Sequence, residues 1–239
     1  MLRLYAASAL LVGSLMLVPC VVAQTKSEEN VGSLRWAEGT PGCTFSADSD
    51  GKYRYGLWTD DFGIILAVDV DEVRKTAERV EPILAVHLTI RNRSDRAFGL
   101  DPRNITLKFV DHYQQVQSAT DPDDLAANVQ KDADTFRRDQ QRELFKHPER
   151  RDEIEKLSSA HLESIAATQA FLRSSALKAN QVNAGQSDTG WLFFNAKSKW
   201  IQNWKKQEQF VLRVPVAGRA VEFPFALPPS QGDLILRKR

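Results

Sequence analysis

The sequence predicts a mainly β fold, an antiparallel β-sandwich interrupted by an inserted α-helical hairpin. Seven short segments alternate apolar and polar residues with a period of two, the pattern of strands that bury one face and expose the other. They follow one another without the strand–helix repetition of parallel sheets, which favours two packed antiparallel layers. From about residue 121 to about residue 182 the period is helical, and no glycine occurs between Gly99 and Gly185.

Length and composition are those of a globular protein. The chain has 239 residues, of which 42% are hydrophobic and 26% are charged, and this composition argues against disorder. Lysine and arginine together number 32, against 31 aspartate and glutamate residues. Because no basic stripe stands out along this balanced chain, we expect no nucleic-acid partner.

Residues 1–23 predict a signal peptide. Arg3 precedes an apolar run over residues 4–18, and the small Ala23 offers a cleavage site. The run is shorter than the roughly 20 residues that span a bilayer, which disfavours a membrane anchor. A lipoprotein signal ending at Cys20 is the alternative, although Pro19 replaces the small residue that such signals carry before the cysteine. We therefore expect a periplasmic or extracellular protein.

Residues 24–40 are polar and lack a period, so we expect a flexible lead-in over residues 24–52, before one folded region over residues 53–239. That region begins with four predicted strands. In the third of them, ILAVHLTIRN, every second residue from Leu84 to Ile90 is apolar and shares one face. The four strands are predicted at residues 53–58, 63–71, 83–92 and 104–111.

Two amphipathic helices joined at a proline are predicted next. Asp121 or Asp123 caps the first helix, and His147-Pro148 ends it because proline disfavours a helical residue before it. The second begins near Glu149. We expect a helical hairpin that is a binding arm, without which the sandwich still folds; the competing hypothesis is that the hairpin covers the sandwich and completes its core. The predicted stripes are Leu125, Val129, Ala133, Phe136 and Leu144 in the first helix and Ile154, Leu157, His161, Ile165 and Leu172 in the second.

Three further strands complete the predicted sheets, at residues 189–195, 208–214 and 219–226. The last two form a hairpin around Ala217-Gly218, because both alternate with a period of two and a glycine-containing pair separates them. Centring the hairpin on that pair sets its cross-strand partners, which share one apolar face. These partners are Val214 with Val221, Leu212 with Phe223 and Phe210 with Phe225.

Two segments carry a resemblance to a known family. ILAVHLTIRNRSDRAFGLDPRNITLKFVD followed by VNAGQSDTGWLFF resembles secreted bacterial immunoglobulin-like domains of the mycobacterial immunoprotective extracellular antigen type. In that family a strand ending in IxN, a short acidic turn and another strand precede a PGxSxxGWLFF-like segment, and here Ala184 replaces the usual proline. The resemblance covers residues 63–111 and 183–227. It implies an immunoglobulin-like sandwich and an extracytoplasmic location, and it brings no catalytic residue.

The sequence lacks the motifs of common enzymes and metal sites. No G-x-S-x-G elbow, phosphate loop or dinucleotide-binding glycine pattern occurs. The four histidines, which include His87 on an outer strand face and His161 in a helical stripe, lack the spacing of metal ligands. Residues 48–51 (DSDG) form half a calcium loop, which we interpret as a turn. With Cys20 removed, Cys43 has no disulfide partner, and we expect a small buried side chain rather than a reactive or intermolecular thiol.

Trp200 and Trp204 are the candidate binding residues. They lie in KSKWIQNWKKQ, between two predicted strands and among four lysines. If exposed, their indole rings can stack on sugars or contact a protein partner, because they offer a large area at low entropic cost. If buried, they close one end of the sandwich.

These observations predict an exported, non-enzymatic binding or interaction protein of the cell envelope, with an unknown protein or envelope partner and no cofactor. Its contact surface is the helical hairpin or an exposed sheet edge. The alternative is a carbohydrate or cell-wall binding module that uses Trp200 and Trp204. A hydrolase is a third class, which the missing catalytic motifs disfavour.

Overall fold

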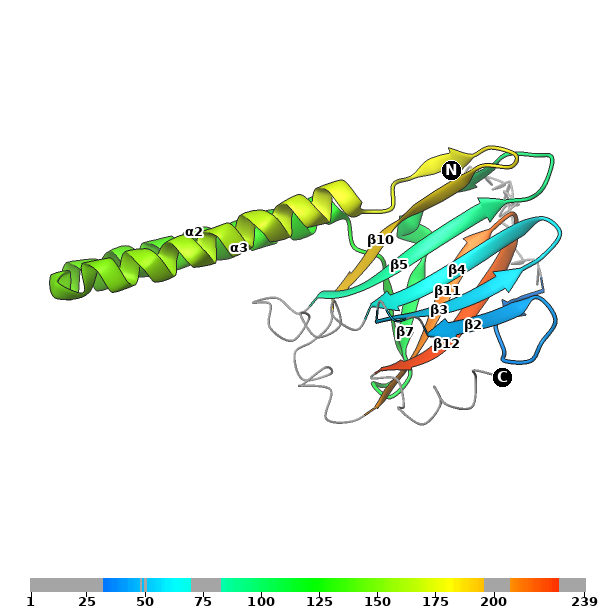
Figure 1. The fold of residues 1–239 in the computed structure, drawn as a ribbon, viewed down its shortest axis with the longest axis horizontal. Coiled ribbons are helices and arrows are strands. Elements are labelled where there is room, and N and C mark those ends of the chain that lie inside the picture. Colours follow the sequence, from blue (N-terminus) through cyan, green and yellow to red (C-terminus); the bar gives the residue numbers. More distant parts are fainter. Residues whose placement is uncertain (1–31, 48, 50, 70–82, 196–206, 228–239) are drawn as a thin grey trace, which may run out of the picture. The chain divides into compact units, whose positions relative to one another are not determined.

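The computed structural model describes residues 32–47, 49, 51–69, 83–195 and 207–227 (Figure 1). Most of the strands form two five-stranded sheets. One, here sheet B, has the order β10 (Ser187–Asn195), β5 (Ile83–Asn92), β4 (Phe62–Asp69), β3 (Lys52–Trp58) and β2 (Cys43–Ala47). The other, sheet A, has the order β1 (Leu34–Arg35), β12 (Arg219–Leu227), β11 (Glu208–Val216), β7 (Thr106–Phe109) and β8 (Gln115–Ser118).

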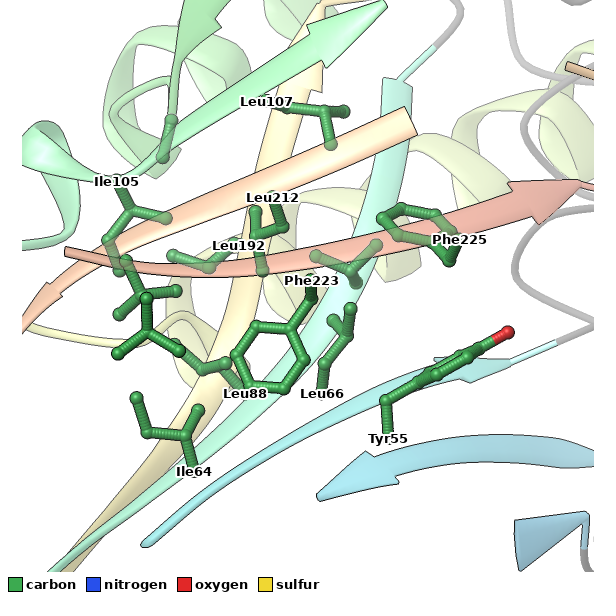
Figure 2. Packing of buried hydrophobic residues seen from close by; sticks show 14 of the residues in the cluster. Tyr55, Ile64, Leu66, Leu88, Ile105, Leu107, Leu192, Leu212, Phe223 and Phe225 are labelled. Atoms are coloured by element: carbon green, nitrogen blue, oxygen red, sulfur yellow. The ribbon is translucent and has the colours of Figure 1, made fainter. Parts of the chain in front are cut away.

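The main hydrophobic core takes its side chains from both sheets (Figure 2). In β11 and β12 the residues of one face are buried and those of the other are more exposed, as the period of two predicts. Sheet A contributes a ring stack in which the centroids of Phe210 and Phe225 lie 5.3 Å apart. The core residues labelled in Figure 2 are Tyr55, Ile64, Leu66, Leu88, Ile105, Leu107, Leu192, Leu212, Phe223 and Phe225.

The predicted C-terminal hairpin is confirmed in type and register. Val214 pairs with Val221, Leu212 with Phe223 and Phe210 with Phe225. Ala217 (φ 48°) and Gly218 (φ 72°) both occupy the left-handed region, as a type I′ turn requires. This turn matches the natural twist of two antiparallel strands, so the alternation of the two strands and the position of the glycine fix the register together.

The two predicted helices are present as α2 (Pro122–Lys146) and α3 (Arg151–Ser175), joined through the 3-10 turn η2 (Pro148–Arg150). The Asp121 carboxylate accepts a hydrogen bond of 2.8 Å from the backbone N–H of Asp123, which caps α2. The helix ends before Pro148, as the sequence predicts. The prediction of a mainly β fold with antiparallel sheets and two helices is confirmed.

The expectation of a flexible lead-in is wrong for residues 34–47. β1 pairs in parallel with β12, and β2 pairs with β3. Trp36 is buried, its indole N–H donates to the carbonyl oxygen of Thr44 at 3.1 Å, and its ring centroid lies 5.0 Å from that of Tyr55. β1 has two residues, too few to show a period, whereas the alternation of Cys43, Phe45 and Ala47 in β2 was a signal that the sequence prediction missed.

Three more short strands were not predicted. β8 extends sheet A, while β6 (Phe98–Leu100) and β9 (Asn180–Val182) form a separate two-stranded sheet. Leu100 and Val182 each add a buried side chain to the main core. The alternation of three or four residues does not distinguish a strand from a loop, because one or two apolar positions are too few for a period.

Candidate functional site

The base of the helical hairpin packs on the outer face of sheet B. A second hydrophobic cluster joins Ile83 and Ala85 of β5 and Phe193 of β10 to the first turns of α2 and the last turns of α3. The sequence places these three apolar residues on the face opposite the main core, so another element must cover them. The hairpin residues buried in this cluster are Leu125, Ala126 and Leu172 of the helices and Ala176, which follows α3.

Backbone contact also holds the end of α3 against β10. The N–H of Leu177 donates to the carbonyl oxygen of Trp191 at 2.9 Å, and Ala176 forms an isolated bridge with the same residue. A Cβ added to Gly190 would lie 2.5 Å from the Leu177 backbone. Glycine at this position therefore permits the close approach.

Beyond the base, the two helices pack on each other. We define the distal hairpin as residues 131–168. Its buried side chains Ala133 and Ile154 belong to neither cluster that includes the sheets. The rings of Phe136 and His161 lie 4.0 Å apart between the helices, so His161 is a packed histidine, as expected.

Two large apolar side chains of the distal hairpin are exposed. Phe145, near the end of α2, has 90% of its surface exposed, and Leu157 in α3 has 59%. The expectation that Leu157 belongs to the helix–helix stripe is wrong, because Ile154 and His161 lie between the helices and Leu157, which is 59% exposed, is rotated about 60° from Ile154 and about 40° from His161 on a helical wheel. The sequence period alone could not separate these two faces.

The charged side chains of the distal hairpin are largely paired within their own helix. Arg142 lies 3.3 Å from Asp139, Lys146 lies 3.3 Å from Glu143, and Arg150 lies 3.0 Å from Glu153. Each pair spans three residues, the spacing that brings neighbours together on a helix. These pairs leave little net charge to attract a strongly charged partner.

A cavity of about 350 Å³ lies where the hairpin meets sheet B. Its lining includes the apolar side chains of Leu177, Trp191 and Phe193. The charged residues around it compensate each other, because Arg103 lies 2.9 Å from Asp101 and Arg173 lies 3.5 Å from Asp123. The bidentate hydrogen bonds from Arg103 lower the pKa of the Asp101 carboxyl. This is the arrangement of a structural ion pair rather than of a catalytic acid.

The candidate binding residues Trp200 and Trp204 lie outside the described residues, as do Asp48 and Asp50 of the half calcium loop. Cys43 is half-buried on β2 and packs against the main core. Within the described ranges, no three His, Cys, Asp or Glu side chains gather closely enough to hold a metal ion. Because Trp200 and Trp204 lie outside these ranges, their role in binding stays a prediction.

Two other tryptophans, Trp58 on β3 and Trp191 on β10, lie on the outer face of sheet B and are partly exposed. Trp58 was not among the residues predicted to bind a ligand. The sequence does indicate its position. Tyr55 and Leu57 face the core, and side chains alternate along a strand, so Gly56 and Trp58 share the outer face. His87 also lies on this face, as predicted, with its ring 5.2 Å from that of Trp191.

None of the helices in the described part of the chain is long and apolar enough to cross a membrane. No family model and no curated protein matches the sequence. Among solved structures, the chain is similar to one titled "Crystal structure of a putative lipoprotein (ycdA)" from Bacillus subtilis, with 13% identity and a TM-score of 0.33. The match covers 83% of this chain and 42% of that one. A likeness at this level carries no functional argument.

Proposed function

We propose that this chain is an exported, non-enzymatic interaction protein of the cell envelope, and that the distal hairpin is its contact surface. The observation that carries the proposal is the division of the hairpin into a base buried against sheet B and a distal part that exposes Phe145 and Leu157. Large exposed apolar side chains are typical of protein-binding surfaces, where they become buried by the partner.

The partner class follows from the side chains on this surface. Because the charges of the distal hairpin are paired within each helix, electrostatic attraction to nucleic acid or to an anionic surface is weak. An apolar pocket on another protein suits Phe145, since an aromatic ring buries a large area on association.

The fold assignment is part of the same proposal. Two five-stranded sheets that share one core support a β-sandwich, and the resemblance of residues 63–111 and 183–227 favours the immunoglobulin-like type of the mycobacterial immunoprotective extracellular antigens. On this basis the hairpin is an insertion into a common extracellular scaffold. Such scaffolds carry many different binding functions, so the insertion rather than the scaffold specifies the partner.

Cross-linking in an envelope extract tests the contact surface. We expect the wild-type chain to give a discrete cross-linked species that is lost in the Phe145→Ser/Leu157→Ser double variant. Both side chains are exposed, so their replacement changes stability by less than about 0.5 kcal/mol each. Tyr113→Ser is the matched control, because Tyr113 is 99% exposed on the turn between β7 and β8. An unchanged species in the double variant contradicts the proposal.

Export is tested separately by mass spectrometry of the protein recovered from outside the cytoplasm. We expect a chain that begins at Gln24. A diacylglyceryl mass on a chain that begins at Cys20 would instead establish a lipoprotein, and a cytoplasmic protein with an intact leader would contradict export.

A further inference from the structure

The outer face of sheet B carries a set of neighbouring side chains beside the hairpin base, and Trp191, at its edge, packs against Phe171 of α3 with ring centroids 5.5 Å apart. Strand register defines it in three rows across the sheet. The first row contains Ser187, Arg91, Gly63 and Trp58; the second contains Thr189, Thr89, Ile65, Gly56 and Thr44; the third contains Trp191, His87, Ala67, Arg54 and Ser46. We call this set the sheet B platform.

The indole of Trp58 lies flat on the platform. A Cβ added to Gly63 would lie 2.3 Å from both Cε3 and Cζ3 of the ring, and one added to Gly56 would lie 3.0 Å from its Nε1. The benzo ring therefore covers Gly63 while the nitrogen side covers Gly56. The ring therefore rests on the sheet, and the Trp58 side chain is partly exposed.

The two glycines have no conformational reason to be glycine. Neither has a positive φ, and each lies inside a strand, where glycine costs about 0.5–1 kcal/mol relative to alanine. Both give room to the Trp58 ring, and Gly56 also gives room to the hydroxyl of Thr44, which would lie 2.3 Å from a Cβ added there. A glycine in a strand often lets another group approach the backbone closely, and here that group is the Trp58 ring.

Cationic side chains surround this surface. Arg91 is exposed and occupies the same row as Trp58, two strands away and roughly 10 Å across the sheet, with only Gly63 between them. Arg54 lies in the third row beside Ala67 and His87. Next along β3 from Arg54, Lys52 lies 3.9 Å from Asp69, the one carboxylate on this face of the described strands. The pKa of His87 is lowered, first by burial and then by the positive charges of Lys52 and Arg54.

We propose that the sheet B platform binds an acidic polysaccharide, with a sugar ring stacked on Trp58 and its carboxylate paired with Arg91. A flat indole suits the C–H face of a pyranose, and a guanidinium suits a carboxylate because it donates two parallel hydrogen bonds. The threonine and serine side chains of the rows supply hydroxyl partners for the sugar. This site is separate from the distal hairpin and does not involve Trp200 or Trp204.

Native gel electrophoresis in the presence of polygalacturonate tests the proposal with the full chain. The matched probe is fully methyl-esterified polygalacturonate, which keeps the sugar backbone and removes its charge. We expect the acid polymer to retard the wild-type chain and the ester to retard it at least about tenfold less at equal concentration, since an ion pair at this site contributes about 1.4 kcal/mol or more.

Variants locate the site on the platform. Trp58→Ala and Arg91→Gln should each weaken retardation by about tenfold or more. Arg213→Gln is the control, because it removes the same charge from an exposed position on sheet A. If Trp58→Ala does not fold, the retardation of Arg91→Gln compared with that of Arg213→Gln still tests the site. No retardation by the acid polymer, equal retardation by the ester, or equal losses in the two arginine variants would overturn the proposal.

Discussion

The side-chain amide of Asn92 donates a hydrogen bond of 2.9 Å to the carbonyl oxygen of Val182, ninety residues later in the chain. Asn92 is fully buried at the end of β5, and Val182 ends β9 after the helical hairpin. The same amide donates to the carbonyl oxygen of Arg96 at 2.7 Å, and its oxygen accepts from the N–H and hydroxyl of Ser94. One side chain thus fixes the turn after β5 and the return of the chain from the hairpin.

Replacing Asn92 by alanine should lower the free energy of unfolding by about 2–3 kcal/mol, because it removes the buried hydrogen bond to the Val182 carbonyl together with the bonds to Arg96 and Ser94. Gln181→Ala is the control on the neighbouring exposed position of β9, and it should cost less than about 0.5 kcal/mol. Urea unfolding of the two variants measures the difference. Equal losses would show that the Asn92 network does not stabilise the folded chain.

Adding a methyl group beneath Trp58 should destabilise the chain. Gly63→Ala places a Cβ within 2.3 Å of the indole and should cost about 1–3 kcal/mol, the range of an overpacked site. In a Trp58→Ala background the same substitution should cost far less, because the clashing ring is absent. A double-mutant cycle measured by thermal or urea unfolding gives this coupling. Equal costs in the two backgrounds would mean that the ring does not lie on Gly63.

How far the sequence predicts the fold depends on the length of each alternating run. β5 was predicted with both its ends, since ten residues show their period clearly. β1 has two residues and pairs in parallel with β12, far away in the chain, so nothing local distinguishes it from a loop. Trp36 is buried for the same non-local reason.

The candidate site was predictable in part. The positions of the helices followed from the Asp121 cap and from Pro148, and the need to cover Ile83 and Phe193 followed from their face of the sheet. The exposure of Phe145 depends on which helix face meets its neighbour, and a single periodic stripe does not determine this. The position of the Trp58 ring on Gly63 depends on the pairing of β3 with β4, and the sequence alone does not give the register of that pairing.

Phe223 should be among the most costly core positions to truncate. It is fully buried between the two sheets, so Phe223→Ala should lower the free energy of unfolding by about 3–5 kcal/mol. Its neighbour Glu222 faces outward and pairs with Arg35 at 3.0 Å. Because that pair is exposed, Glu222→Ala should cost no more than about 1 kcal/mol. Similar losses in urea melts would contradict the register of β12.

Stability should fall on acidification partly through His87. Its pKa is lowered in the folded chain by burial and by Lys52 and Arg54, while the unfolded chain has the ordinary value of about 6.5. As the pH falls through that value, the unfolded chain binds the proton first, so the stability present above it is lost. The His87→Gln variant should therefore lose less stability than wild type between about pH 8 and pH 5.5. Parallel urea melts check this, and identical losses would exclude a contribution from His87.

The distal hairpin should be dispensable for folding, while its base should not. Gln169 donates from its side-chain nitrogen to the carbonyl oxygen of Ala126 at 3.1 Å and to the side chain of Gln130 at 3.0 Å, so residues 130 and 169 lie side by side. A short Gly/Ser linker can therefore replace residues 131–168 at a small loop-closure cost. This variant should melt cooperatively and keep most of the stability of the sheets.

Replacing residues 123–181 instead removes Leu125, Ala126, Leu172 and Leu177 and leaves Ile83, Ala85 and Phe193 uncovered. It also removes the pairing of β9 with β6. The loss of the three buried leucines, at about 2–5 kcal/mol each, approaches the whole stability of a typical domain. We expect this longer deletion to be molten or aggregated by circular dichroism and thermal melting. If it folds as well as the shorter one, the base is no part of the core; if the shorter one also fails to fold, the distal helices stabilise the sheets and their role as a separate contact surface is lost.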